Sequence, residues 1–101
     1  MKTMLFTGAV LFAIGAHAAT PEEILTKSGC TACHSVDKKL IGPAYKVVSE
    51  KYKGKDASAD LMAKVRKGGS GVYGPIPMPP NPPDKISDAD LKAVTEWILK
   101  L

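Results

Sequence analysis

The sequence predicts a small all-α protein of about four helices, and three observations lead to this fold class. Apolar residues recur at spacings of three and four in several segments, which is the period of an amphipathic helix. No segment shows the alternation of apolar and polar residues that is typical of a β-strand. Capping residues precede the helical patterns, and segments rich in Gly and Pro separate them.

The first 18 residues have the pattern of a secretory signal peptide. Lys2 supplies a positive charge, an apolar stretch runs from Met4 to about Ala16, and Ala16-His17-Ala18 matches an A-x-A cleavage site. The stretch is shorter than the roughly 20 apolar residues that a membrane-spanning helix needs. We therefore expect export to the periplasm, cleavage after about Ala18, and no stable membrane insertion of the mature protein. The alternative is an uncleaved membrane anchor.

Residues 19–101 would then form one domain of 83 residues. A chain of this size buries a marginal core, so small folds commonly depend on a disulfide, a metal or a cofactor. Without Lys2, the domain carries 13 Lys and Arg against 10 Asp and Glu, a net charge of +3. This mild excess suits docking to an acidic protein surface. It lacks the basic, aromatic-interleaved patch of nucleic-acid binders, so no nucleic-acid partner is expected.

The segment Thr20-Pro21-Glu22-Glu23 predicts that the first helix starts at Pro21. Thr20 fits an N-cap, Pro is favoured at the first helical position, and a Glu three residues after the cap completes a capping box. Ile24 and Leu25 would form the buried stripe of this helix. Gly29 either ends the helix or allows another helix to approach closely, and we favour the close approach.

Three further helices follow. Gly42-Pro43 marks a loop that turns into a second helix, from about Pro43 to Tyr52. A third helix is expected to start after Ser58 and to end at Gly68-Gly69. Ser87 fits the N-cap of a last helix. The residues expected to face inward are Tyr45, Val48 and Tyr52 in the second helix, Leu61, Met62 and Val65 in the third, and Leu91, Val94, Ile98 and Leu101 in the last. Three cations near the C-terminus of the third helix would interact favourably with the helix dipole. They are Lys64, Arg66 and Lys67.

An irregular loop from Ser70 to Pro83 separates the third helix from the last. Six prolines lie among its last nine residues, which excludes both a helix and a central strand. Because each proline ring fixes a backbone φ angle, this loop is stiff.

The chain's only two cysteines lie in Cys30-Thr31-Ala32-Cys33-His34. C-x-x-C-H is the attachment signature of a c-type haem. Two thiols one helical turn apart can add to two vinyl groups of a porphyrin, and the next residue brings an imidazole under the iron. Such haems are attached outside the bacterial cytoplasm, which agrees with the export signal. The other interpretations are a thioredoxin-like redox pair, half of a zinc site and a structural disulfide.

If His34 binds the iron on one side, the residue on the other side decides between an electron carrier and a catalyst. The second histidine and two of the four methionines leave with the signal peptide. Of the two that remain, Met62 fits the apolar face of a helix, whereas Met78 lies between two prolines of the stiff loop. We therefore expect His34 and Met78 as axial ligands. Such ligation raises the reduction potential and closes both axial positions, which favours electron transfer.

Three segments occur in a distinctive order: Cys30 to His34, Ile41-Gly42-Pro43-Ala44-Tyr45, and Gly71-Val72-Tyr73-Gly74-Pro75-Ile76-Pro77-Met78-Pro79-Pro80. Together they resemble the short bacterial class I cytochromes c of the c-551/c-552 type, over essentially the whole mature chain. The resemblance implies the class I cytochrome c fold around one covalently bound haem c. It also implies thioether bonds from Cys30 and Cys33, and axial ligation by His34 and Met78.

The same resemblance implies contacts around these ligands. The Pro43 carbonyl would accept a hydrogen bond from the free ring N–H of His34, which fixes the imidazole. Asn81 would hydrogen-bond near the Met78 sulfur. Tyr73 and Lys64 would hold a haem propionate, although many relatives have Trp at the position of Tyr73.

We expect a monomeric electron carrier, not an enzyme, that passes one electron between redox proteins of a respiratory or denitrification chain. The donor could be of the cytochrome bc1 type, and the acceptor a terminal oxidase, a nitrite reductase or a peroxidase. Lys27, Lys38 and Lys39 are candidates for docking to an acidic partner. Two alternatives remain: a haem enzyme or gas sensor with a displaceable Met78, and a thiol–disulfide oxidoreductase.

Overall fold

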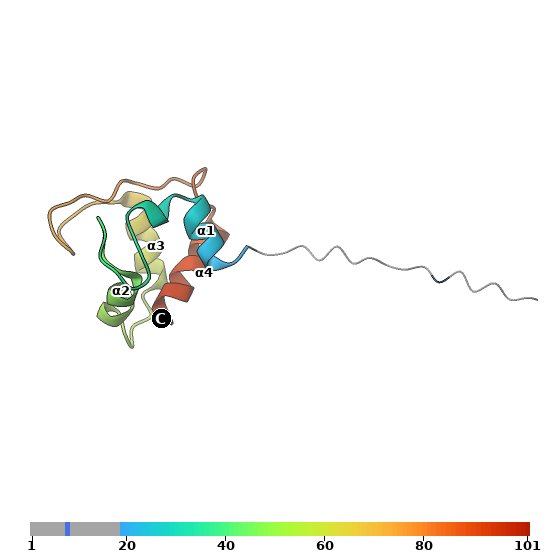
Figure 1. Ribbon diagram of the computed structural model, residues 1–101, viewed down its shortest axis with the longest axis horizontal. Coiled ribbons are helices and arrows are strands. Elements are labelled where there is room, and N and C mark those ends of the chain that lie inside the picture. Colours follow the sequence, from blue (N-terminus) through green and yellow to red (C-terminus); the bar gives the residue numbers. More distant parts are fainter. Residues whose placement is uncertain (1–7, 9–18) are drawn as a thin grey trace, which may run out of the picture.

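The structure, a computed structural model, describes Gly8 and residues 19–101. It contains α1 (Pro21–Lys27), a 3-10 turn η1 (Cys30–Ala32), α2 (Tyr45–Lys51), α3 (Ser58–Lys67) and α4 (Asp88–Leu99) (Figure 1). The described residues form no β-strand, and the predicted all-α fold class is confirmed. Within the same residues, no helix is long and apolar enough to cross a membrane. The expected signal peptide, residues 1–18, lies outside the described part of the chain except for Gly8.

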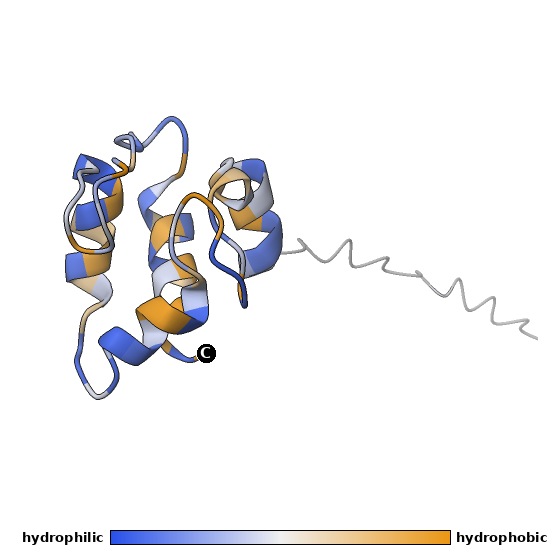
Figure 2. Cartoon of the chain, turned by 60° about the vertical axis from the view of Figure 1, so that its left-hand side comes forward, coloured by the Kyte–Doolittle hydropathy of each residue, from blue (hydrophilic) through white to orange (hydrophobic). Residues whose placement is uncertain are grey.

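Helix α4 contacts each of the other three α-helices and forms the centre of the core. Its residues Leu91, Val94 and Ile98 are buried, as predicted. Each helix carries both polar and apolar residues, as expected of helices that bury one face (Figure 2). The predicted inward position of Leu101 is wrong, because α4 ends at Leu99 and Leu101 is 40 % exposed. Thr95, which was not among the residues predicted to face inward, is buried.

Helix α1 begins where its capping residues predict. The Thr20 hydroxyl accepts a hydrogen bond from the Glu23 backbone N–H at 3.2 Å. The favoured role of Gly29 is wrong, because this residue follows the C-cap Ser28 with a φ of +79°. A Cβ at this position would have only Lys85 Cε within 4 Å, so no helix approaches it closely. Gly29 instead ends α1 in the left-handed conformation and turns the chain into η1.

Helix α2 begins two residues later than the sequence predicts, at Tyr45. Ala44 stays extended as the N-cap, and the backbone N–H groups of Tyr45 and Lys46 donate to the carbonyls of Ser35 and Val36 at 2.9 and 3.1 Å. The segment that follows the C-x-x-C-H motif therefore satisfies the free amides of the first turn of α2. This pairing joins the motif to α2.

Helix α3 begins at Ser58, one residue earlier than predicted, and ends at Lys67, just before the predicted Gly68-Gly69. Leu61 is buried, and Met62 and Val65 pack against the core. The long loop after α3 contains neither helix nor strand and runs along one side of the molecule before it reaches α4 (Figure 1).

Candidate functional site

A cavity of about 480 Å³ lies among the four α-helices, the C-x-x-C-H segment and the long loop. Helix side chains such as Val48, Leu61, Val94 and Ile98 line it, and they are apolar. The volume lies in the range of about 300–1,000 Å³ that is typical of sites for small molecules and cofactors. Cys30, Cys33, His34 and Met78 all line this cavity.

The 3-10 turn η1 brings the two cysteines and the histidine onto one wall of the cavity. The Cys33 and His34 backbone N–H groups both donate to the Cys30 carbonyl, at 3.2 and 3.0 Å. Cys30 and Cys33 are half-buried, and no disulfide joins them. The spacing that predicted two neighbouring thiols and an adjacent imidazole therefore gives that arrangement in the folded chain.

The other interpretations of this motif gain no support from the structure. Burial raises the pKa of the Cys30 thiol, more than the nearby Lys85 charge lowers it. A thioredoxin-like nucleophile needs the opposite shift. No group of three or more His, Cys, Asp or Glu side chains within residues 19–101 could hold a zinc ion, and the two cysteines do not form a disulfide there.

The His34 ring is oriented on three sides. Its Nδ1 lies 2.8 Å from the Pro43 carbonyl oxygen, and because a carbonyl only accepts, Nδ1 carries the proton and donates it. The ring stacks on Tyr45 with centroids 5.0 Å apart and planes 19° apart. A Cβ at Gly42 would lie 2.5 Å from the ring carbon Cε1, so only glycine fits there. This arrangement leaves the lone pair of Nε2 free to bind a metal.

The predicted contact between His34 and Pro43 is therefore present. The stacking of Tyr45 on His34 was not predicted, although Tyr45 was expected on the inner face of α2. Burial raises the pKa of the Tyr45 phenol far above its usual value, so its ring stays neutral beside the imidazole. The sequence feature that could have predicted this stacking is the short separation along the chain between Tyr45 and the C-x-x-C-H motif.

Met78 faces the same cavity from the long loop, and backbone hydrogen bonds hold it there. The Gly69 N–H donates to the Met78 carbonyl at 3.0 Å, and the Met78 N–H donates to the Gly69 carbonyl at 2.9 Å. Gly68 has a φ of +70°, and a Cβ there would collide with the Met78 carbonyl oxygen. Close contact with the end of α3 thus fixes the backbone of Met78.

The remaining predicted residues lie near this cavity in different roles. Lys64 and Tyr73 line it. Asn81 is buried, but its side-chain amide donates to the carbonyls of Pro79 and Val65 at 3.0 and 3.3 Å, not to the Met78 sulfur. One of these two acceptors, the Pro79 carbonyl, belongs to the residue next to Met78. Tyr73 is 39 % exposed, and the partial burial of its phenol raises the pKa of that group.

The sequence model of the family described as cytochrome c matches residues 18–101. The chain belongs to the cytochrome c family. It is 53 % identical over 83 residues to cytochrome c2 of Rubrivivax gelatinosus, covering 81 % of this chain and 98 % of the relative. It is 51 % identical to cytochrome c-551 of Azotobacter vinelandii over 81 residues, covering 79 % of this chain and 95 % of the relative.

Solved structures agree with this membership. The crystal structure of Nitrosomonas europaea cytochrome c552 matches with a TM-score of 0.73 and 47 % identity, over 79 % of this chain and 98 % of the other. The class 1 cytochrome MtoD of Sideroxydans lithotrophicus matches with a TM-score of 0.69 and 36 % identity, over 79 % and 90 %. The class I cytochrome c fold that the sequence resemblance implied is confirmed.

A cytochrome c carries a covalently attached haem c with iron, and this cytochrome has the two cysteines that thioether attachment requires. The cavity fits such a group, because it is apolar and has the size of a cofactor site. Two thiols and an imidazole line one wall, and a thioether sulfur lies in the loop that also lines it. These donors are the ones that haem c attachment and iron ligation use.

Proposed function

We propose that this cytochrome c is a one-electron carrier whose single haem c is attached to Cys30 and Cys33, with His34 and Met78 as axial ligands. The observation that carries the proposal is that His34 and Met78 line one cavity from two segments, each of which backbone hydrogen bonds fix in place. Two fixed ligands would close both axial positions, so small substrates would have no free coordination site. When bound, the haem supplies the one-electron couple.

In this proposal each part of the chain has a stated task. The Pro43 carbonyl keeps Nδ1 of His34 protonated, which leaves Nε2 to bind the iron. The apolar side chains around the cavity would exclude water from a bound haem iron. The Gly69 bridge fixes the backbone of Met78, which would limit the movement of the ligand between redox states and so lower the reorganisation needed for electron transfer.

The decisive test compares Met78→Ala with Met62→Ala in the holoprotein. Met62 packs against the core from α3 and provides the matched loss of one methionine side chain. Met78→Ala should remove the far-red sulfur-to-iron band, lower the reduction potential and let carbon monoxide bind the ferrous form. Met62→Ala should retain the band. A wild-type protein that binds carbon monoxide readily would favour the alternative of a gas sensor or haem enzyme with a displaceable Met78.

We also propose that the protein works in the periplasm as a monomer, after cleavage of residues 1–18. Mass spectrometry of the secreted protein should give the mass of residues 19–101 plus one haem, and no thiol should react with a thiol reagent. A mass that includes residues 1–18 would contradict cleavage. Free thiols would contradict thioether attachment and revive the thiol–disulfide oxidoreductase alternative.

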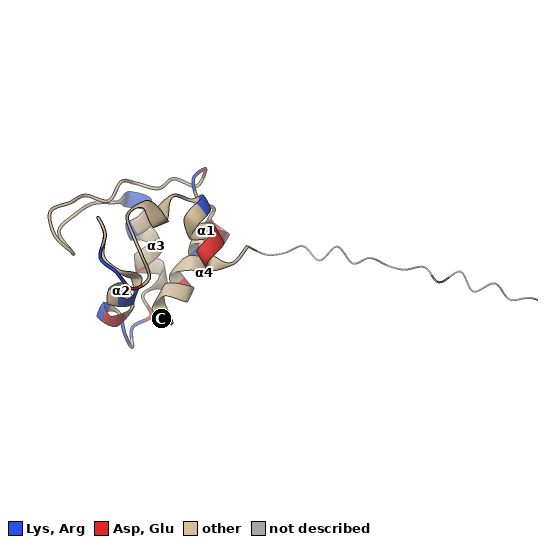
Figure 3. Ribbon diagram, in the orientation of Figure 1, with Lys and Arg blue, Asp and Glu red and all other residues tan. Residues whose placement is uncertain are grey.

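The proposed partners are redox proteins of a respiratory or denitrification chain that present an acidic surface. Basic residues occur on α2 and on the segment before it (Figure 3). Lys38 and Lys39 are exposed there, next to the exposed apolar Leu40 and Ile41. Added salt should slow electron transfer to such a partner, because it screens attraction between exposed charges. Lys39→Glu should slow it more than Lys92→Glu on α4, and equal effects would contradict docking through this segment.

A further inference from the structure

The loop that carries Met78 is attached at two places, one just after the end of α3 and one in its last turn. The first is the Gly69 bridge at Met78 itself. The second is Asn81, whose backbone N–H and side-chain amide donate to the Val65 carbonyl at 3.0 and 3.3 Å. Between Met78 and Asn81 lie only Pro79 and Pro80, whose rings fix φ. The position of Asn81 therefore strongly restricts the position of Met78.

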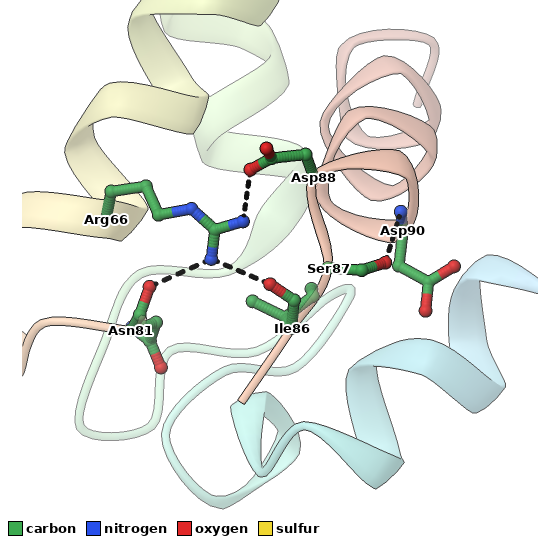
Figure 4. A network of polar contacts seen from close by, with 6 residues as sticks. All are labelled: Arg66, Asn81, Ile86, Ser87, Asp88 and Asp90. Atoms are coloured by element: carbon green, nitrogen blue, oxygen red, sulfur yellow. Dashed lines mark hydrogen bonds and ion pairs between the residues drawn. The ribbon is translucent and has the colours of Figure 1, made fainter. Parts of the chain in front are cut away.

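Arg66 binds the backbone carbonyl of Asn81. Its guanidinium nitrogen NH1 donates to the carbonyls of Asn81 at 3.0 Å and Ile86 at 2.7 Å, and NH2 donates to an Asp88 carboxylate oxygen at 2.6 Å (Figure 4). The Arg66 side chain is only 21 % exposed. One side chain of α3 thus joins the Met78 loop to the first residue of α4.

The three contacts of Arg66 differ in their surroundings. The Asp88 side chain is 81 % exposed, so water competes for its carboxylate and this ion pair contributes little. The two carbonyl contacts are part-buried, and a hydrogen bond from a charged donor is stronger than one between neutral groups. Arg66 therefore fixes the loop mainly through its hydrogen bonds to the carbonyls of Asn81 and Ile86.

We propose that Arg66 is a positioning residue for Met78, which acts through the Asn81 and Ile86 carbonyls to keep the methionine sulfur at its axial place. The proposal rests on the proposed function, in which Met78 is an iron ligand. Arg66 itself does not touch the iron. Its role is to keep the chain from Met78 to Ile86 against α3, so that the sulfur cannot move away and leave the metal open.

The test uses four variants of the holoprotein. Arg66→Gln removes the guanidinium, and Arg66→Lys restores the positive charge without the planar fork. Asp88→Asn removes only the exposed ion pair. Lys67→Gln removes one positive charge from the same turn of α3, where Lys67 is exposed, and so controls for the general effect of charge on the reduction potential.

Two measurements report on the loop. Amide hydrogen exchange at Met78 follows the opening of the Gly69 bridge, and the rate of carbon monoxide binding to the ferrous form follows the release of the sulfur. Arg66→Gln should raise both by about tenfold, the effect of losing one net hydrogen bond to a charged group. Arg66→Lys should give an intermediate increase. Asp88→Asn and Lys67→Gln should leave both rates within about twofold of the wild type.

Exchange of the Val94 amide, in the middle of α4, separates a local effect from general loss of stability. If Arg66→Gln accelerates exchange at Val94 as much as at Met78, the proposal is overturned, because Arg66 then only stabilises the whole fold. Equal rates in Arg66→Gln and Lys67→Gln would overturn it as well. A wild-type protein without the sulfur-to-iron band would instead show that the proposed ligation by Met78 is wrong, and the role of Arg66 would fail with it.

Discussion

Gly68→Ala should loosen the candidate ligand Met78 and destabilise the fold strongly. Gly68 is the C-cap of α3 and has φ +70° and ψ −159°. Residues other than glycine rarely adopt this backbone conformation. Its added Cβ would collide with the Met78 carbonyl oxygen and lie 2.9 Å from two backbone atoms of Pro79 and Pro80. These atoms belong to the backbone of a proline-stiffened loop, so they cannot move aside as a flexible side chain would.

Gly54 offers a matched control for this change. It has a φ of +76°, close to that of Gly68, but nothing lies within 4 Å of the Cβ it would gain. Gly54→Ala should therefore lower the free energy of unfolding by about 1–2 kcal/mol, the cost of holding alanine at a positive φ. Gly68→Ala adds overpacking of about 1–3 kcal/mol and weakens two backbone hydrogen bonds of about 1 kcal/mol each. We expect Gly68→Ala to lower the free energy of unfolding by about 3 kcal/mol more than Gly54→Ala.

Urea unfolding of the two holoprotein variants measures this difference through the transition midpoints at equal slope. The far-red sulfur-to-iron band reports separately on Met78 and should weaken only in Gly68→Ala. If both variants lose the same stability and keep the same band, the contact between Gly68 and the Met78 carbonyl has no energetic role, and the reasoning is refuted.

Three further changes test other parts of the structure. Gly42→Ala should shift the reduction potential in voltammetry, since the added Cβ would lie 2.5 Å from Cε1 of His34 and push the imidazole from its place. Leu91→Ala should lower the free energy of urea unfolding by about 2–5 kcal/mol, because Leu91 is 1 % exposed. Raising the pH above about 10 should lower the free energy of unfolding, since burial raises the pKa of Tyr45 and the unfolded state loses that proton first.

Each of these has its own control. An unchanged potential in Gly42→Ala would mean that His34 is not constrained from that side. Leu101→Ala should change stability by less than about 0.5 kcal/mol, as expected of an exposed residue, and a loss as large as that of Leu91→Ala would contradict the assigned core. Tyr45→Phe should flatten the loss of stability at high pH, and a loss of the same steepness in this variant would assign it to other groups.

Local sequence features predicted most of the helices. The N-caps Thr20 and Ser87 form the hydrogen bonds that their residue types predict, at 3.2 and 3.1 Å. The helical spacing of Leu91, Val94 and Ile98 identified the inner face of α4. Such features involve residues within one or two turns of each other, so the sequence displays them directly.

Errors occurred where the outcome depended on distant parts of the chain. The start of α2 depends on the carbonyls of Ser35 and Val36, which accept from its first amides. The role of Gly29 depended on whether another helix lay beside it, and none does. Leu101 continued the spacing of the inner face, but α4 ends before it.

The sequence by itself determined the four donor groups of the candidate site. The motif gives two thiols and an imidazole, and the proline-rich loop gives Met78. Only the tertiary structure decided how these groups are held. The orientation of the His34 ring is set by contacts with Gly42, Pro43 and Tyr45, which fold back against it.

The placement of Met78 depends in the same way on contacts with α3. From sequence, Arg66 was one of three cations that suit the end of a helix dipole, whereas in the structure it reaches the carbonyls of Asn81 and Ile86. The physical reason is that backbone carbonyls are present at every residue. A sequence shows which side chains can donate to them, and only packing decides which carbonyls come within reach.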